Sequence, residues 1–105
     1  MIDHAKVIDD INELLDSSER DRDQMERTLT DGYAHALSLE AERWRVQKKL
    51  RALAATIERG DLARKSKEMA ELAHRIEQKD GELTGLRELL TRLRNQYSET
   101  LAKSR

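Results

Sequence analysis

The chain has 105 residues, no phenylalanine, proline or cysteine, 3% aromatic and 39% charged residues, and a formal net charge of −1. Phe and Trp supply much of the buried area in ordinary cores, so this composition excludes a large globular core, and the lack of cysteine excludes disulfides and thiolate metal sites. It predicts a single all-α domain over residues 1–105, built from long helices or a coiled coil.

A heptad pattern runs without a slip through the first half of the chain. Its positions follow alternating steps of three and four residues: Ile8, Ile11, Leu15, Ser18, Arg22, Met25, Leu29, Gly32, Ala36, Leu39, Arg43, Val46, Leu50, Leu53 and Ile57. Such a repeat is typical of a coiled-coil helix. It predicts a first helix over about residues 2–59.

Two places in this helix have the composition of a boundary. Ser17-Ser18 followed by Glu19 and Asp21 resembles a helix start, and Thr30-Asp31-Gly32 resembles a stop and restart. Because the heptad register continues across both places, we favour one helix, bent at Gly32. The alternative is a three-helix bundle broken near Gly32.

A turn at about residues 59–61 separates this helix from a second one. In Arg59-Gly60-Asp61, glycine can end a helix and aspartate can cap the next. A second heptad pattern then predicts a helix over about 61–104, with positions Leu62, Lys65, Met69, Leu72, Ile76, Lys79, Leu83, Leu86, Leu90, Leu93, Tyr97 and Thr100. The predicted fold is an antiparallel coiled-coil helical hairpin, in which Leu29 lies near Leu90 and Arg22 near Tyr97.

The N-terminal part of the first helix extends beyond the second helix in this hairpin. Residues 2–15 nevertheless carry an apolar stripe that includes Ile8, Ile11 and Leu15. An isolated amphipathic helix of this length is marginal in water. We therefore expect the stripe to bind another chain, most simply a second copy in a homo-oligomer; the alternative is a frayed N-terminus.

A second apolar stripe faces away from the predicted seam. Tyr33, Leu37, Ala41 and Trp44 follow one another at helical spacing, and exposed aromatic residues are enriched at protein interfaces. The stripe predicts a docking face for another protein or a second copy. Alternatively, Trp44 lies flat against neighbouring side chains.

Basic residues surround the predicted turn. Residues 43–67 contain nine basic and two acidic residues, whereas residues 1–31 contain four basic and ten acidic ones. The cluster that we name the basic tip is Lys48, Lys49, Arg51, Arg64, Lys65 and Lys67. It suits nucleic-acid phosphates, an acidic protein groove or anionic lipid; the alternative is a solvated face that keeps the hairpin soluble.

No residue pattern predicts catalysis or a bound cofactor. His4, His35 and His74 lack a second histidine or carboxylate at metal-binding helical spacing, so we expect surface histidines and no metal. A hairpin also offers no cavity for a small-molecule substrate. No apolar run is long enough for a membrane span, and we expect a cytoplasmic protein that is not an enzyme.

Two families share parts of this pattern. Gly60-Asp61-Leu62 at a hairpin tip resembles the coiled-coil domain of Gre-type transcript-cleavage factors, which insert their tip into RNA polymerase. Arg64 stands where that family has its second acid, so the resemblance does not imply metal-assisted cleavage. Residues 39–93 also look like the tRNA-binding helical arm of seryl-tRNA synthetases.

The sequence therefore predicts a non-enzymatic coiled-coil module for protein–protein interaction, such as a scaffold, adaptor or assembly subunit. The alternative is a helical hairpin that binds nucleic acid or RNA polymerase through the basic tip.

Overall fold

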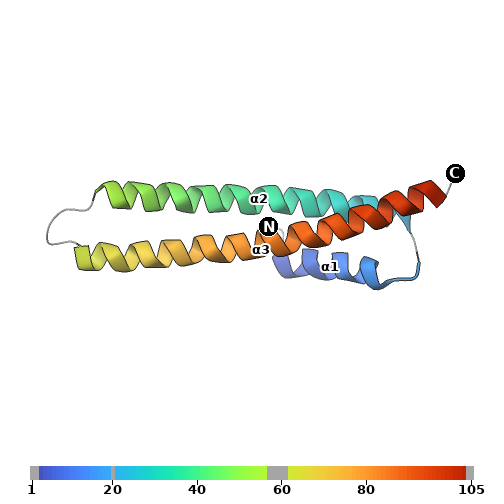
Figure 1. Ribbon diagram of the computed structural model, residues 1–105, viewed down its shortest axis with the longest axis horizontal. Helices are drawn as coiled ribbons and strands as arrows, with labels where there is room; N and C mark the ends of the chain where they lie inside the picture. Colours follow the sequence, from blue (N-terminus) through green and yellow to red (C-terminus); the bar gives the residue numbers. More distant parts are fainter. Residues whose placement is uncertain (1–2, 20, 57–61, 104–105) are drawn as a thin grey trace. The chain divides into compact units, whose positions relative to one another are not determined.

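The computed structural model describes residues 3–19, 21–56 and 62–103. This part of the chain contains the helices α1 (His4–Asp16), α2 (Arg22–Ala55) and α3 (Leu62–Lys103), shown in Figure 1. The prediction of an all-α fold is confirmed. The second helix was predicted at 61–104 and α3 spans almost the same residues, whereas the predicted turn at 59–61 and Ile57 lie outside the described residues.

The prediction of one continuous helix over residues 2–59 is wrong. The chain leaves helical geometry at Ser17, whose backbone is extended with φ −74° and ψ 138°. The Ser17 hydroxyl accepts a hydrogen bond from the Glu19 amide at 3.1 Å, and the Asp21 carboxylate accepts one from the Gln24 amide at 3.2 Å. Short polar side chains that bond to nearby backbone in this way compete with the helix and cap the next one.

The alternative of a break near Gly32 is also wrong, because α2 is continuous through that residue. The boundary lies about four turns earlier, at the serine pair that had the composition of a helix start. Asp3 marks the other end of α1: its carboxylate accepts a hydrogen bond from the Ala5 amide at 3.1 Å, as an N-cap residue does.

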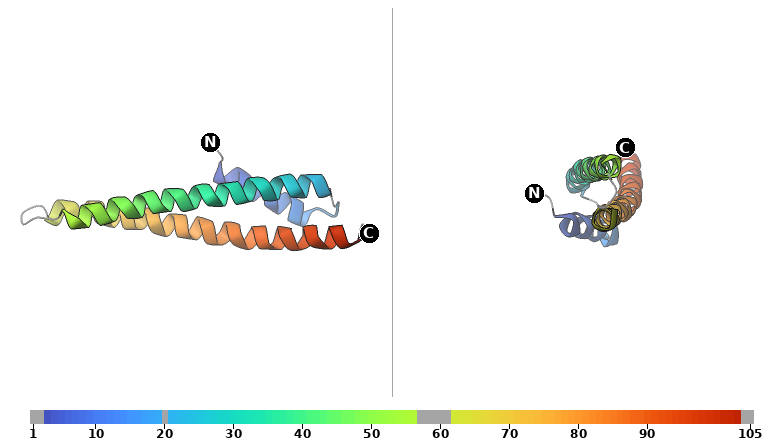
Figure 2. Two further views of the ribbon diagram at one scale, coloured as in Figure 1. Left: turned by 90° about the horizontal axis from the view of Figure 1, so that it is seen from above. Right: turned by 90° about the vertical axis from the view of Figure 1, so that its left-hand side faces the viewer.

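The helices pack in two compact units. The three-helix unit, Met1–Leu37 with Thr84–Arg105, contains α1, the first part of α2 and the last part of α3. Figures 1 and 2 agree in placing α1 beside the other two helices of this unit. The two-helix unit, Ser38–Leu83, contains the rest of α2 and the start of α3, which run antiparallel. The predicted antiparallel packing of two long helices is confirmed.

Most of the buried apolar side chains belong to the three-helix unit. Each of its helices contributes three: Val7, Ile11 and Leu14 from α1, Met25, Leu29 and Ala36 from α2, and Leu86, Leu90 and Leu93 from α3. The α1 stripe is therefore covered within the chain, and the prediction that residues 2–15 extend past the second helix is wrong. The chain reversal between α1 and α2 is what returns this stripe to the core.

At Gly32 a side chain of α3 packs closely against α2. A methyl group placed on Gly32 would overlap Leu90 Cδ2 and would lie 3.7 Å from Ile11 Cδ1. The missing side chain lets α3 approach α2 closely while α1 covers the same position. Gly32 is thus a packing residue and not a helix breaker.

The register of α2 against α3 in this unit differs from the predicted one. Leu90 lies against Gly32, three residues from the expected Leu29, and the Tyr97 hydroxyl lies 3.5 Å from Glu26 Oε2, four residues from the expected Arg22. Both pairs are displaced by three or four residues along α2, about one helical turn. The heptad pattern repeats every two turns and has a polar residue at position 22. It therefore constrains the register of α2 against α3 only weakly.

In the two-helix unit, charged residues occupy part of the seam. Arg43 Nε lies 2.6 Å from Asp80 Oδ1, and Lys79 Nζ lies 3.0 Å from Glu42 Oε2. Arg43 Nε is buried and not well aligned for a hydrogen bond, so its contact with Asp80 is an ion pair. The carboxylates remain partly exposed, so each pair contributes at most about 1 kcal/mol and serves mainly to favour one register.

Replacing Gly32 by alanine should destabilise the chain, although alanine is the better helix former by about 1 kcal/mol. The added methyl group must displace Leu90, at a cost of about 1–3 kcal/mol. We expect a net loss in the free energy of unfolding, measured by urea denaturation followed by circular dichroism.

Gly81→Ala and Gly85→Ala are matched controls, because a methyl group at either position meets nothing within 4 Å. Each should raise the free energy of unfolding by up to about 1 kcal/mol. If Gly32→Ala stabilised the chain as these two variants do, the close packing of Leu90 on α2 would be disproved.

Candidate functional site

The predicted N-terminal interaction stripe lies against the other helices of its own unit. Ile11 has no exposed surface, and Ile8 and Leu15 are half-buried. Ile11 can therefore contact a partner only if α1 leaves the unit. The stripe contributes to the core of the three-helix unit, and its use by a second copy stays a prediction.

The outward stripe on α2 remains accessible. Tyr33 and Leu37, which belong to the three-helix unit, are 43% and 66% exposed. Trp44, in the two-helix unit, is 58% exposed. These exposed fractions are large for apolar side chains of this size, so both units present apolar surface on α2.

Trp44 has one close cationic neighbour. Lys48 Nζ lies 5.1 Å from the centre of the Trp44 ring, within the range of a cation–π interaction. Lys48 is thus one neighbouring side chain beside Trp44, as the alternative prediction for this residue expects. More than half of the Trp44 side chain nevertheless stays open to solvent.

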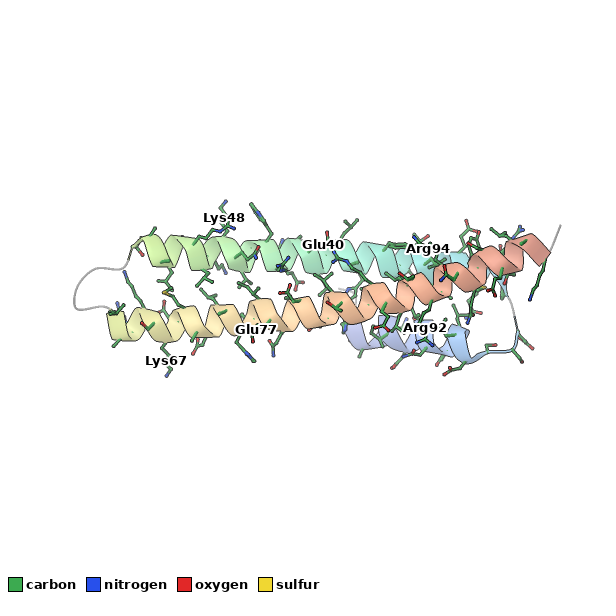
Figure 3. The ribbon with its side chains drawn as sticks, in the orientation of Figure 1. Glu40, Lys48, Lys67, Glu77, Arg92 and Arg94 are labelled. Carbon is green, nitrogen blue, oxygen red and sulfur yellow. The ribbon has the colours of Figure 1, made fainter. Side chains whose placement is uncertain are left out.

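Five residues of the basic tip are exposed, and the sixth is hydrogen-bonded to another part of the chain. Lys48, Lys49 and Arg51 on α2, and Arg64 and Lys67 on α3, are exposed. Lys65 is half-buried, and its amino group donates a hydrogen bond to the Thr56 carbonyl oxygen. In Figure 3, Lys48 points away from α3 and Lys67 points away from α2. Two residues of the tip are thus directed outward from different helices of the two-helix unit.

Positive charge is concentrated on one segment of α2. Residues 43–55 contain five basic residues and no acidic residue. Arg43 pairs with Asp80 across the seam. The other four, all exposed, form no ion pair with any residue that the structure describes: Arg45, Lys48, Lys49 and Arg51.

The expectation of surface histidines is wrong for His35. Its side chain is 5% exposed, and His4 Nδ1 lies 2.9 Å from His35 Nε2. The ring centres are 5.1 Å apart, so the two nitrogens lie nearly on the line between the rings, as in an N–H···N hydrogen bond. The contact joins α1 to α2 within the three-helix unit. His74 is exposed, as expected.

This histidine pair could not be recognised from spacing. The two residues are 31 positions apart, and in one continuous helix they would lie far from each other. Their contact depends on the reversal at Ser17, which brings the start of α1 back to the middle of α2. The available signal was the composition of residues 17–21, which resembled a helix start.

A surface hollow on α2 is lined by Asp23, Glu26, Arg27, Thr30 and Asp31. No group of three or more histidine, aspartate or glutamate side chains within the described ranges is arranged to hold a metal ion. None of the helices found there is long and apolar enough to cross a lipid bilayer.

No known protein family matches the chain, and neither a curated protein nor a solved structure matches it. The exposed residues of α2 and the basic tip are therefore the features on which a function can be argued.

We expect His4→Ala to lower the free energy of unfolding by about 1 kcal/mol, because it removes the hydrogen bond to a buried ring nitrogen of His35. In a His35→Leu background the same substitution should cost less, since no buried imidazole is left. Urea denaturation of the four proteins at neutral pH gives the coupling energy.

His74→Ala provides the control, and because His74 is exposed it should change stability by less than about 0.5 kcal/mol. Additive effects of the two substitutions at neutral pH would show that the His4–His35 contact contributes nothing.

Proposed function

We propose that this chain is a non-enzymatic protein–protein interaction module, a scaffold, adaptor or assembly subunit that works in the cytoplasm. In this proposal α2 and α3 form a coiled-coil hairpin, and the outer face of α2 binds a protein partner or a second copy of the chain. The observation that carries the proposal is the exposure of Trp44, which is 58% open to solvent.

Two further observations support this choice of surface. Tyr33 and Leu37 are exposed on the same helix, at spacings of four and seven residues that repeat one helical face. The apolar side chains of α1 are used within the chain, as the burial of Val7, Ile11 and Leu14 demonstrates. Tryptophan and tyrosine are also the residue types that most often dominate binding energy at interfaces.

A triple variant, Tyr33→Ser with Leu37→Ser and Trp44→Ser, tests the self-association part of the proposal. If the partner is a second copy, the wild-type chain associates at micromolar concentration and the variant is monomeric, because apolar area drives association. Light scattering measures the mass, and circular dichroism checks that the helices are retained.

Leu62→Ser is the matched control, because Leu62 on α3 is also 58% exposed. This substitution should leave the mass unchanged. A wild-type chain that stays strictly monomeric would refute self-association through this face and leave a different protein as the partner.

The second candidate function is binding of nucleic acid or RNA polymerase through the basic tip. It rests on the segment 43–55, which has five basic residues and no acidic one, and on the outward direction of Lys48 and Lys67 (Figure 3). Lys65 is less available for this role because its amino group binds the Thr56 carbonyl.

This second function predicts binding to RNA or DNA oligonucleotides that weakens steeply with salt, since each phosphate contact releases counterions. Charge reversal of Lys48, Lys49 and Lys67 to glutamate should lower the affinity at least about tenfold and reduce the salt dependence. Fluorescence anisotropy at several salt concentrations measures both. If the wild-type chain does not bind the oligonucleotides at low salt, direct binding of nucleic acid through the basic tip is excluded.

A further inference from the structure

We propose that the partner of the two-helix unit is an acidic amphipathic helix of another protein, which lies along α2 over Trp44. This inference rests on the proposed function and specifies the chemistry of the partner. It uses four exposed residues of α2, which we name the Trp44 face: Ala41, Trp44, Lys48 and Arg51.

The Trp44 face is a continuous strip on one side of a helix. From Ala41 the other members follow at three, seven and ten residues, a spacing that keeps all four side chains on one face. The seam residues Leu39, Val46 and Leu50 are buried or half-buried and lie on the opposite side of α2. A partner can therefore cover the strip without disturbing the packing of α2 on α3.

The strip joins an apolar half to a basic half. Ala41 and Trp44 offer apolar contact, and Lys48 and Arg51 lie one and two turns further along. Lys48 Nζ is 5.1 Å from the Trp44 ring centre, so a carboxylate that pairs with Lys48 would lie close to the indole. Arg45 and Lys49 add positive charge beside the strip, so the complementary surface is apolar at one end and acidic at the other.

An amphipathic helix fits this surface better than a nucleic acid does. Trp44 is the only tryptophan in the chain, and no second aromatic residue accompanies it on the two-helix unit for stacking of successive bases. Phosphate contacts would use the cations and leave the apolar half uncovered. A helix with anchors at steps of three, four and seven residues matches the strip along its length.

A second copy of the chain is the poorer occupant. Its acidic amphipathic helix is α1, with four acidic residues and one lysine. The apolar residues Val7, Ile11 and Leu14 of α1 are buried inside their own unit. Docking α1 on a second molecule would expose the core of the three-helix unit, so we assign the strip to a different protein.

Three synthetic amphipathic peptides test the inference. They share a leucine stripe confined to one end of one face and carry glutamate, glutamine or lysine at all other positions. The single tryptophan of the chain reports binding directly through its fluorescence emission. We expect the glutamate peptide to shift the emission to shorter wavelength and to bind at least about tenfold more tightly than the glutamine peptide, with no binding of the lysine peptide.

Lys48→Glu with Arg51→Glu should weaken binding of the glutamate peptide at least about tenfold. Arg75→Glu with Arg92→Glu is the matched control: it makes the same change in net charge at two exposed residues of α3 outside the basic tip, and it should alter the affinity less than about threefold. Circular dichroism of both variants confirms that the helices remain.

Equal binding of the glutamate and glutamine peptides, unchanged in Lys48→Glu with Arg51→Glu, would overturn the acidic partner and leave the proposed docking of proteins on α2 intact. If no peptide shifts the emission, the inference also fails. A shift caused by phosphatidylserine vesicles or by an oligonucleotide, but not by the glutamate peptide, would assign the strip to those ligands instead. The triple variant of the proposed function, tested by light scattering, decides separately whether the chain self-associates through α2.

Discussion

The three-helix unit depends on the contact between Leu90 and the bare backbone of Gly32. A chain without phenylalanine and with few aromatic residues must gain its stability from close contact of small aliphatic side chains. At Gly32 the absence of a Cβ atom lets Leu90 of α3 reach the α2 backbone while Ile11 of α1 covers the same place. The His4–His35 hydrogen bond then joins the start of α1 to α2.

Heptad spacing predicts much of this fold, but it does not predict the boundary between α1 and α2. The seam residues Met25, Leu29, Leu83 and Leu86 are buried as the spacing predicted, because an amphipathic helix has one way to bury its stripe. The register continued through Ser18 and Arg22 although neither is buried. Two successive polar seam positions remove the apolar contacts that hold a helix in place. Local hydrogen bonds of the Ser17 and Asp21 side chains therefore decide that the helix ends here.

The candidate site was predicted in part for the same reason. Exposure of Trp44 and Leu37 follows from their positions opposite the seam, which periodicity gives directly. The burial of Ile11 and the pairing of His35 depend on where α1 lies, and that depends on the reversal at Ser17. Helical periodicity describes which face a residue occupies, but it contains no information on which helix will cover that face.

The location of α1 separates the apolar residues that stabilise the three-helix unit from those that stay exposed on α2. Because α1 covers the apolar side chains of α2 and α3 within the three-helix unit, the core is complete in a single molecule. Trp44 and its neighbours take no part in that core. If the outer face of α2 binds a partner as proposed, substitutions there can change the choice of partner at little cost in folding, so binding specificity can evolve, or be redesigned, on an unchanged scaffold.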